Sequence, residues 1–406
     1  MFDKIIKYMK HIKYFEEKAL YDNYISNDPI LPNVSYTLDT NQVFYNLPKS
    51  GEKNYMYVEA LEDDTLVLFK GLGQTNSSFY VDPYNTLEYS VDQQTWNTIS
   101  ADGTATTINT GEKLYFRGEC TDIHFDESAG TMGIGAFLVT KKHNVGGNIM
   151  SLLFSDNFED KIDLTGYDYV FGGLFINTTV FTNGDEGKLV SAENLLLPAT
   201  TLTPFCYYSM FVGCTSLITP PQLPATTLAD LCYGSMFAFC TSLTTTPELP
   251  ATTLADSCYY NMFYSCTALV TATELSATEL ADSCYSWMFA NCTSLVNVPS
   301  TLSATTLTNN CYSQMFYYCT SLTTAPKLPA TKLEYECYSR MFIGCASLSN
   351  ITMLATDISE TRCLDYWVSS VASTGTFYKH PDMTSLPTGY NGIPSGWEVV
   401  DYNVAS

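Results

Sequence analysis

The chain has 406 residues, about two to three times the length of a typical domain, so several domains or one long repeat array are expected. Apolar residues make up 46% of the chain and charged residues only 15%, which excludes a disordered polypeptide. Because the formal net charge is −23, a nucleic-acid backbone and an anionic lipid surface are poor partners, and we expect no nucleic-acid ligand.

Residues 1–50 begin with an amphipathic pattern and are predicted to form an attachment segment. Apolar residues at helical spacing, with lysines between them, predict an anchoring helix over residues 2–26. The apolar positions of this helix are Phe2, Ile5, Met9 and Ile12. It would dock on its own chain or a sister subunit, on a larger assembly, or on a membrane, and Glu16 and Glu17 argue against the membrane because they offset the basic charge. Neither a secretory signal nor a run of about 18 apolar residues is visible, so we expect no export signal and no membrane insertion.

Residues 51–145 change to short runs rich in Val, Tyr, Phe and Thr, separated by turn residues. These runs, such as YMYVEAL, DTLVLFKGL and EKLYFRG, predict a small antiparallel β-sandwich domain. In SVDQQTW, the residues Ser90, Asp92, Thr95 and Trp96 resemble the Asp-box hairpin of sialidase-like propellers, although a glycine and one further residue of that motif are absent. We interpret this segment as a hairpin turn.

Internal repetition is the strongest signal in the sequence, and it follows a break at Gly146 and Gly147. Residues 146–195 are expected to be a lead-in and N-terminal cap, residues 196–368 a solenoid, and residues 369–406 a C-terminal cap. Six units share the pattern CYxxMFxxC at a spacing of 26 residues, once 27, and their methionines are Met210, Met236, Met262, Met288, Met315 and Met341.

Within each unit, a turn of 100° per residue places the repeated residues on one face and the variable residues on the other. In the third unit the repeated residues are Cys258, Tyr259, Met262, Phe263 and Cys266. The agreement between this helical period and the variation from unit to unit predicts that CYxxMFxxC is a helix with a buried face. The following TSL and LPATTL segments would lead back to the next helix as extended chain. The pattern fades at both ends, where Leu174–Phe175 replaces Met-Phe and Trp367 replaces Met.

Each unit carries two cysteines eight residues apart, such as Cys206 and Cys214. On a helix they would be separated by about 12 Å, whereas a disulfide requires about 4.4 to 6.8 Å between α-carbons. The cysteines also form two ladders along the array and do not converge on a metal ion. We therefore expect these cysteines to act as small buried apolar residues. Disulfide bonds between neighbouring repeats remain an alternative in an oxidising medium.

The unit MFxxCTSLTTxPELPATTLADxCYxx resembles the BspA-like leucine-rich repeat, whose period is usually slightly shorter. Met210–Phe211, Cys214 and Leu217 stand at the positions of its AFxxCxxL signature, and the next five units match them. The resemblance covers about residues 165–368 and implies a BspA-like leucine-rich-repeat solenoid with a C-terminal cap. Together with the N-terminal helix and the small antiparallel β-sandwich predicted above, this gives an expected α+β fold class. Such repeats occur in bacterial adhesins, protist surface proteins and virion proteins of gut phages.

Outside the repeats, the chain is similar to accessory virion proteins of Bacteroides-infecting phages, including crAss-like ones. The segments that carry this likeness are NVSYTLDTNQVFYN, the VDQQTW turn, GNIMSLLFSDNF and the tail GTFYKHPDMTSLPTGYNGIPSGWEVVD. The likeness implies a protein that is assembled in the bacterial host cytoplasm and located in the virion.

Catalysis would need polar groups that converge, and the four histidines are scattered over separate regions without a nucleophile elbow, metal-ligand spacing or phosphate loop. We therefore predict a non-enzymatic protein without cofactor or metal. The variable slots of the repeats instead carry aromatic residues among Ser, Asn and Gly, a mixture that suits sugar faces or protein partners. The candidate partner or glycan face consists of Tyr208, Phe239, Tyr260, Tyr264, Trp287, Tyr317 and Tyr318. The alternative is that these side chains pack against sister subunits or neighbouring domains.

Two functions remain at this stage. The first is a structural protein of a phage virion, a head or tail fibre or decoration, anchored to other virion proteins by its N-terminal region and displaying the solenoid as an adhesion module for host-surface or mucosal glycans. The second is a bacterial cell-surface or secreted BspA-like adhesin. In either case we expect a homo-oligomer.

Overall fold

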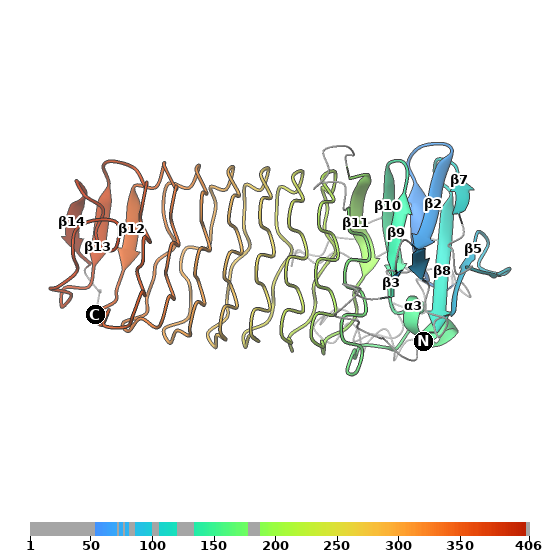
Figure 1. Ribbon diagram of the computed structural model, residues 1–406, viewed down its shortest axis with the longest axis horizontal. Helices are drawn as coiled ribbons and strands as arrows, with labels where there is room; N and C mark the ends of the chain where they lie inside the picture. The colour runs from blue at the N-terminus through green and yellow to red at the C-terminus, as the bar shows by residue number, and fades with distance from the viewer. Residues whose placement is uncertain are drawn as a thin grey trace, which may run out of the picture.

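The computed structural model describes residues 53–70, 73–75, 78–80, 86–99, 105–119, 134–177 and 187–402. This part of the chain forms a rod, with a β-domain at one end and stacked coils along the rest (Figure 1). The predicted attachment segment 1–50, with the helix that contains Phe2, Ile5, Met9 and Ile12, lies outside the described residues.

The β-domain consists of two larger sheets that pack face to face. Its strands are β1 (Met56–Ala60), β2 (Thr65–Lys70), β3 (Gly73–Thr75), β4 (Ser78–Tyr80), β5 (Thr86–Ser90), β6 (Asn97–Thr98), β7 (Ala105–Ile108), β8 (Lys113–Glu119), β9 (Ala136–Val139) and β10 (His143–Asn148). One sheet has the order β11-β10-β1-β8-β5-β6, in which β11 is Leu189–Leu196, the second has the order β7-β2-β9, and β3 pairs with β4. The rings of Phe116 on β8 and Phe137 on β9 lie 4.7 Å apart, so the two sheets share one core.

Strand β10 joins the β-domain to the repeats. After it come the short helices α3 (Ser151–Phe154) and η2 (Ser155–Asn157), and then β11 (Leu189–Leu196), which pairs with β10 in parallel. Strand β10 therefore runs through the boundary expected between residues 145 and 146, and the residues on both sides belong to one sheet. A Cβ on Gly146 would lie 2.4 Å from the Tyr57 ring, and one on Gly147 would lie 1.9 Å from the Tyr55 carbonyl oxygen. These two glycines allow close approach of neighbouring chains instead of forming a linker.

The CYxxMFxxC segments are chains of tight turns, and the prediction that they are helical is wrong. Residues 196–368 contain no helix, and every fourth residue of each segment has left-handed backbone, as at Ser257 (φ 53°), Asn261 (58°) and Ser265 (58°). The amide of Tyr260 donates to the carbonyl of Ser257 three residues back (2.9 Å), whereas the amide of Asn261 donates to Ser286 in the next coil (3.0 Å). Alternate amides thus close a local turn or join two coils, which satisfies the backbone without a helix.

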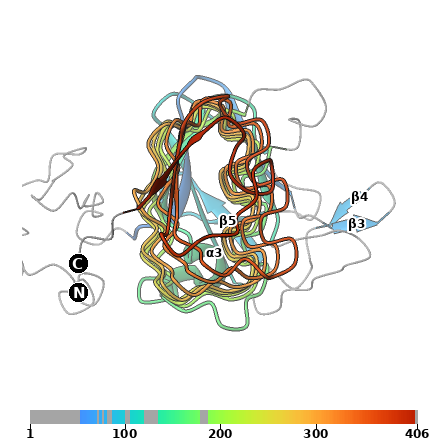
Figure 2. The same ribbon diagram turned by 90° about the vertical axis from the view of Figure 1, so that its left-hand side faces the viewer.

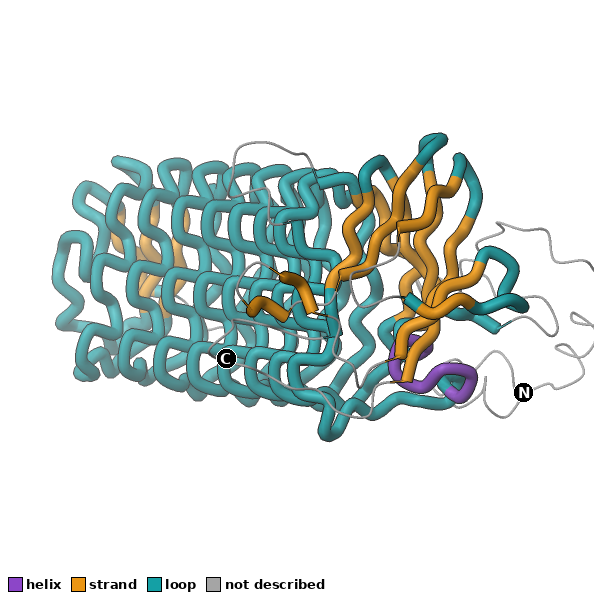
Figure 3. The backbone as a smooth tube through the Cα atoms, turned by 45° about the vertical axis from the view of Figure 1, so that its right-hand side comes forward, coloured by secondary structure: helices purple, strands orange, loops and turns teal. Residues whose placement is uncertain are grey.

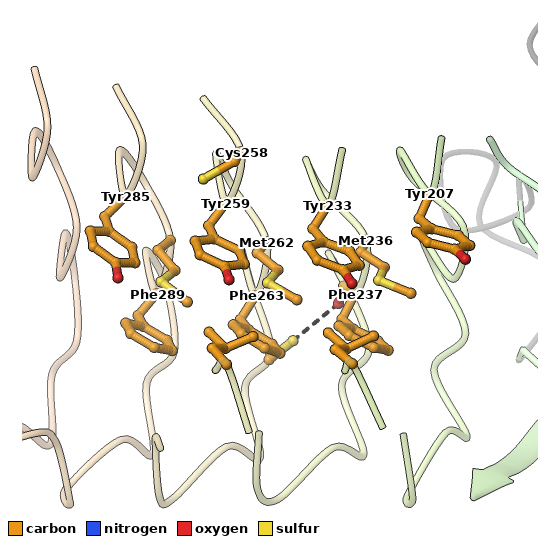
Figure 4. Packing of buried hydrophobic residues seen from close by; sticks show 14 of the residues in the cluster. Tyr207, Tyr233, Met236, Phe237, Cys258, Tyr259, Met262, Phe263, Tyr285 and Phe289 are labelled. Carbon is orange, nitrogen blue, oxygen red and sulfur yellow. Dashed lines mark hydrogen bonds between the residues drawn. The ribbon is translucent and has the colours of Figure 1, made fainter. Parts of the chain in front are cut away.

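The predicted burial of the repeated residues is confirmed, but about half of the variable residues, such as Ser235, Ala238 and Ser313, are buried as well. The tyrosine, methionine, phenylalanine and cysteine positions are buried and stack on their counterparts in neighbouring coils (Figure 4). Neighbouring tyrosine rings of this ladder lie 5.6 to 6.0 Å apart, and they belong to Tyr207, Tyr233, Tyr259, Tyr285, Tyr312 and Tyr338. Viewed along the rod, the coils lie almost on top of one another (Figure 2).

Both ends of the ladders are covered by residues that depart from the repeat. Phe175 stacks between Phe137 of β9 and Phe211 of the first unit, at 5.6 and 5.3 Å. The amide of Phe342 donates to the carbonyl of Trp367, which places Trp367 in the methionine slot as predicted. The Trp367 indole donates to the Gly392 carbonyl (2.9 Å), which ties the C-terminal cap to the last coil.

A wall of extended chain runs opposite the turns. Parallel bridges such as Thr245 to Thr271 and Thr271 to Asn297 join coil to coil. Towards the C-terminus the wall becomes a regular parallel sheet of β12 (Asn350–Met353), β13 (Thr376–Lys379) and β14 (Glu398–Asp401). Strand ladders therefore mark the two ends of the rod, with irregular coils between them (Figure 3).

Candidate binding surface on the turn side of the repeats

Each turn segment has four variable slots, two after the tyrosine and two after the phenylalanine of the repeat. In units one to five these slots hold Val212 and otherwise only aromatic, small, hydroxyl or amide residues, and none is charged, although the whole chain has a net charge of −23. Charged residues enter these slots only at Arg340 and Asp365 in the last two coils. We call the slots of units one to five the turn face.

Five of the seven predicted aromatic residues form a continuous line of ring contacts across four coils. Phe239 lies 5.3 Å from Tyr264, Tyr264 lies 6.1 Å from Trp287, and Trp287 lies 5.4 Å from Tyr317. Tyr317 lies 4.6 Å from Tyr318, and neighbouring rings are inclined by 48 to 72°. The rings thus pack on one another within the chain, yet 45% of the surface of Tyr318 remains exposed.

Three of these aromatic residues occupy left-handed backbone positions, with φ of 62° at Phe239, 61° at Trp287 and 55° at Tyr318. Bulky residues are disfavoured there by about 1 kcal/mol or more, because Cβ crowds the following carbonyl. Equivalent slots in other units hold residues that accept this conformation readily, such as Asn261 and Asn291. Bulky residues adopt the same backbone conformation elsewhere in the repeats, as at Leu231 and Arg340, so it is a general feature of the turns in this array.

Two glycines fix the orientation of tyrosine rings in the preceding coil. A Cβ on Gly344 would lie 2.9 to 3.0 Å from three adjacent atoms of the Tyr318 ring, which places the glycine against the face of that ring. Gly234 bears the same relation to Tyr208, with approaches of 2.9 and 3.0 Å. Each of these two tyrosine rings therefore lies against a position of the next coil where a side chain larger than glycine would clash with it.

Tyr208 and Tyr260 form a second aromatic group on the turn face, outside the continuous line. The Tyr208 ring lies 5.6 Å from Phe205, which stacks on Tyr169 at 4.3 Å. Tyr260 is half-buried, and its pKa is raised by burial and then by the neighbouring Tyr208. Sequence reasoning missed Phe205 and Tyr169, because neither lies in a slot that repeats as an aromatic.

A row of exposed acids borders the turn face. Asp230, Asp256 and Asp282 occupy the same position in three successive coils, and all three are exposed turn residues. The Asp256 carboxylate accepts the amide of Asp282 (3.0 Å), and the Asp282 carboxylate accepts the amide of Asn309 (3.0 Å). These acids join neighbouring turns and give this rim of the surface a negative charge.

The cysteines are buried side chains of the core, as predicted. All thirteen described cysteines are free thiols, and burial raises the pKa of Cys214 and Cys266 to about 12. In one ladder each thiol contacts a phenylalanine carbonyl of the preceding coil, as Cys240 does at Phe211 (3.2 Å). No group of three or more His, Cys, Asp or Glu side chains placed to hold a metal ion is found in the described part of the chain.

The β-domain carries a separate polar cluster beside the predicted hairpin. Strands β5 and β6 are antiparallel, which confirms the hairpin turn, and the Asp92 carboxylate accepts the amides of Thr95 and Gln94. The amide of Thr95, followed by that of Gln94, lowers the pKa of Asp92 to about 2. The Arg117 guanidinium lies over the Trp96 ring at 4.2 Å.

Arg117 also forms ion pairs with Glu88 at 2.7 Å and with Asp156 at 3.0 Å. Because Asp156 belongs to η2, this network fastens the hairpin to the start of the repeats.

The two described histidines lie apart from the turn face. His143 is buried in β10, where its Nδ1 lies 3.0 Å from the Lys141 carbonyl oxygen. His380 lies in the C-terminal cap, 3.7 Å from Asp382. The remaining two, His11 and His124, fall outside the described residues.

The turn face offers stacking surfaces and hydrogen-bonding groups, which are the features of a binding surface.

Comparisons with known proteins find no matching family model, curated protein or solved structure. The likeness to BspA-like repeats and to phage virion proteins accordingly stays a prediction from the sequence. Among the described residues, no helix has the length and apolar character needed to cross a membrane.

Proposed function

We propose that this protein is a non-enzymatic adhesion protein, and that it serves as a structural protein of a phage virion, in a head or tail fibre or decoration. The observation that carries the adhesion role is the uncharged turn face, with its line of ring contacts from Phe239 to Tyr318. Tyr, Trp, Ser, Gly and Asn form the same mixture in antibody paratopes, where aromatic rings supply contact area at low entropic cost.

The virion role is supported by the sequence resemblance outside the repeats. In this role the N-terminal region binds other virion proteins, and the rod displays the turn face to a host-surface or mucosal glycan. Copies of the chain form a homo-oligomer, which multiplies weak contacts into strong attachment. The second candidate is a bacterial cell-surface or secreted BspA-like adhesin, which the repeat pattern supports equally well.

Mass spectrometry of purified phage particles from a Bacteroides host tests the location. We expect the chain in the particle at a fixed copy number, and stepwise stripping of the particle then assigns it to head or tail. Detection only in bacterial surface fractions would reject the virion role and leave the bacterial adhesin.

A further inference from the structure

We infer that the turn face binds a neutral glycan, laid along the rod across units two to five, with Tyr318 and Trp287 as the principal stacking residues. This inference rests on the proposed adhesion function and adds that the glycan is neutral and is bound as a linear chain. It commits to a carbohydrate in preference to a protein or an anionic polymer.

Charge is the first argument for a neutral ligand. None of the slots of units one to five is charged, and the rim of Asp230, Asp256 and Asp282 adds negative charge beside them. An anionic glycan would meet this rim and a chain with net charge −23, so uronate or sialate residues are disfavoured. The slots of units one to five also lack Arg, the one charged residue that is enriched in protein interfaces.

The second argument is the geometry of Tyr318. Gly344 lies against one face of the ring and the Tyr317 ring lies 4.6 Å away, yet Tyr318 keeps 45% of its surface exposed. A flat, fixed aromatic face is complementary to the apolar C–H face of a pyranose ring. Trp287 lies in the preceding coil and contacts Tyr317, which in turn contacts Tyr318. Its indole provides a larger aromatic ring than that of a tyrosine.

The third argument is the spacing of rings and polar groups along the rod. Ring contacts between neighbouring coils measure 5.3 to 6.1 Å, close to the length of one sugar unit in an extended chain. Asn291 and Gln314 are partly exposed on the same face, and their amides both donate and accept hydrogen bonds, as sugar hydroxyls require. The site therefore fits a linear chain of several units better than a single sugar.

The chain itself supplies conservative variants that remove rings without disturbing the turns. Asn291 occupies in unit four the slot that Tyr318 occupies in unit five, and Asn261 occupies in unit three the slot of Trp287. Trp287→Asn and Tyr318→Asn should therefore fold normally, which circular dichroism and thermal melting would verify. Tyr390→Asn is the matched control, because Tyr390 is 53% exposed but lies in the C-terminal cap.

The test measures binding of the fluorescently labelled full chain to Bacteroides cells that are untreated, oxidised with periodate, or digested with proteinase K. We expect binding to survive protease and to be abolished by periodate, which cleaves sugar diols. Purified neutral polysaccharides, a galactomannan and a mixed-linkage β-glucan, should compete better than polygalacturonate. Trp287→Asn and Tyr318→Asn should each weaken binding by about tenfold or more, as expected for interface hot spots, while Tyr390→Asn binds as the wild type.

Binding that resists periodate and is lost after protease would overturn the glycan inference while leaving the adhesion function intact. Unchanged binding by both ring variants would overturn the assignment to the turn face. Absence of binding to untreated cells across a panel of strains would reject the proposed adhesion function itself, together with this inference.

Discussion

Mild acid is expected to loosen the junction between the β-domain and the repeats, because His143 in β10 is buried in its neutral form. Burial lowers the pKa of His143 from 6.5 to about 4, against the opposing effect of its hydrogen bond to the Lys141 carbonyl. The unfolded chain therefore binds a proton more readily than the folded chain. The contribution of neutral His143 to the stability of the fold is present above pH 6.5 and is lost as the pH falls towards 4.

The magnitude follows from the pKa difference. At about 1.4 kcal/mol per pKa unit, acidification from pH 7 to pH 5 removes about 2 kcal/mol from this region, and pH 4 removes about 3 kcal/mol. Asp92, whose pKa is lowered to about 2, stays ionised at pH 5 and does not contribute in this interval. The effect between pH 7 and pH 5 is therefore dominated by the histidine.

Hydrogen exchange followed by mass spectrometry is the appropriate measurement, because it reports local opening in a long array that need not unfold in one step. Amides of β10 and β11 should exchange about thirtyfold more readily at pH 5 than at pH 7, once the intrinsic pH dependence is subtracted. His143→Asn keeps a donor for the Lys141 carbonyl but cannot titrate, so its protection should hardly change. Equal protection of the wild type at both pH values, or an equal loss in the variant, would refute the reasoning.

Three further predictions concern the core and the turns. The Tyr233 hydroxyl is buried without a protein hydrogen-bond partner, so Tyr233→Phe should raise the free energy of unfolding by about 1 kcal/mol in a denaturant titration, and a loss of stability would show that the hydroxyl is bonded. Gln93 has left-handed backbone (φ 59°), so Gln93→Gly should raise the melting temperature of the β-domain, whereas Gln93→Val should lower it. Thirteen of the fourteen thiols are described and buried, so Ellman's reagent should react with these only after denaturation, and rapid reaction of more than one thiol per native chain would contradict the burial.

The core of the repeats could be predicted from the sequence, but the backbone that forms it could not. The buried pairs Cys258–Tyr259 and Met262–Phe263 lie four residues apart, and over nine residues that period is hardly different from the 3.6 of a helix. The distinguishing signal was present in the variable slots. Ser257, Asn261 and Ser265 are small or amide residues at four-residue intervals, which favours left-handed turns over a continuous helix.

The composition of the turn face was predictable, whereas its contacts were not. Phe239, Tyr264 and Trp287 occupy different slots of their units, so sequence spacing alone does not bring them together. Their contact depends on the alignment of successive coils, which is set by the backbone bonds between coils. The same is true of Gly146, which looks like a chain break in the sequence and proves to be a close contact with Tyr57 inside a sheet.

The hydrogen bonds that alternate amides donate to the next coil have a consequence for the gene. Each coil donates to the next through the same positions, as Tyr233 does to Cys258 and Tyr259 does to Cys284. A recombination event that duplicates or removes one unit of codons would therefore leave every interface in the rod of the same kind. The length of the displayed surface can vary between descendants in steps of one coil, while the two capping ends remain unchanged.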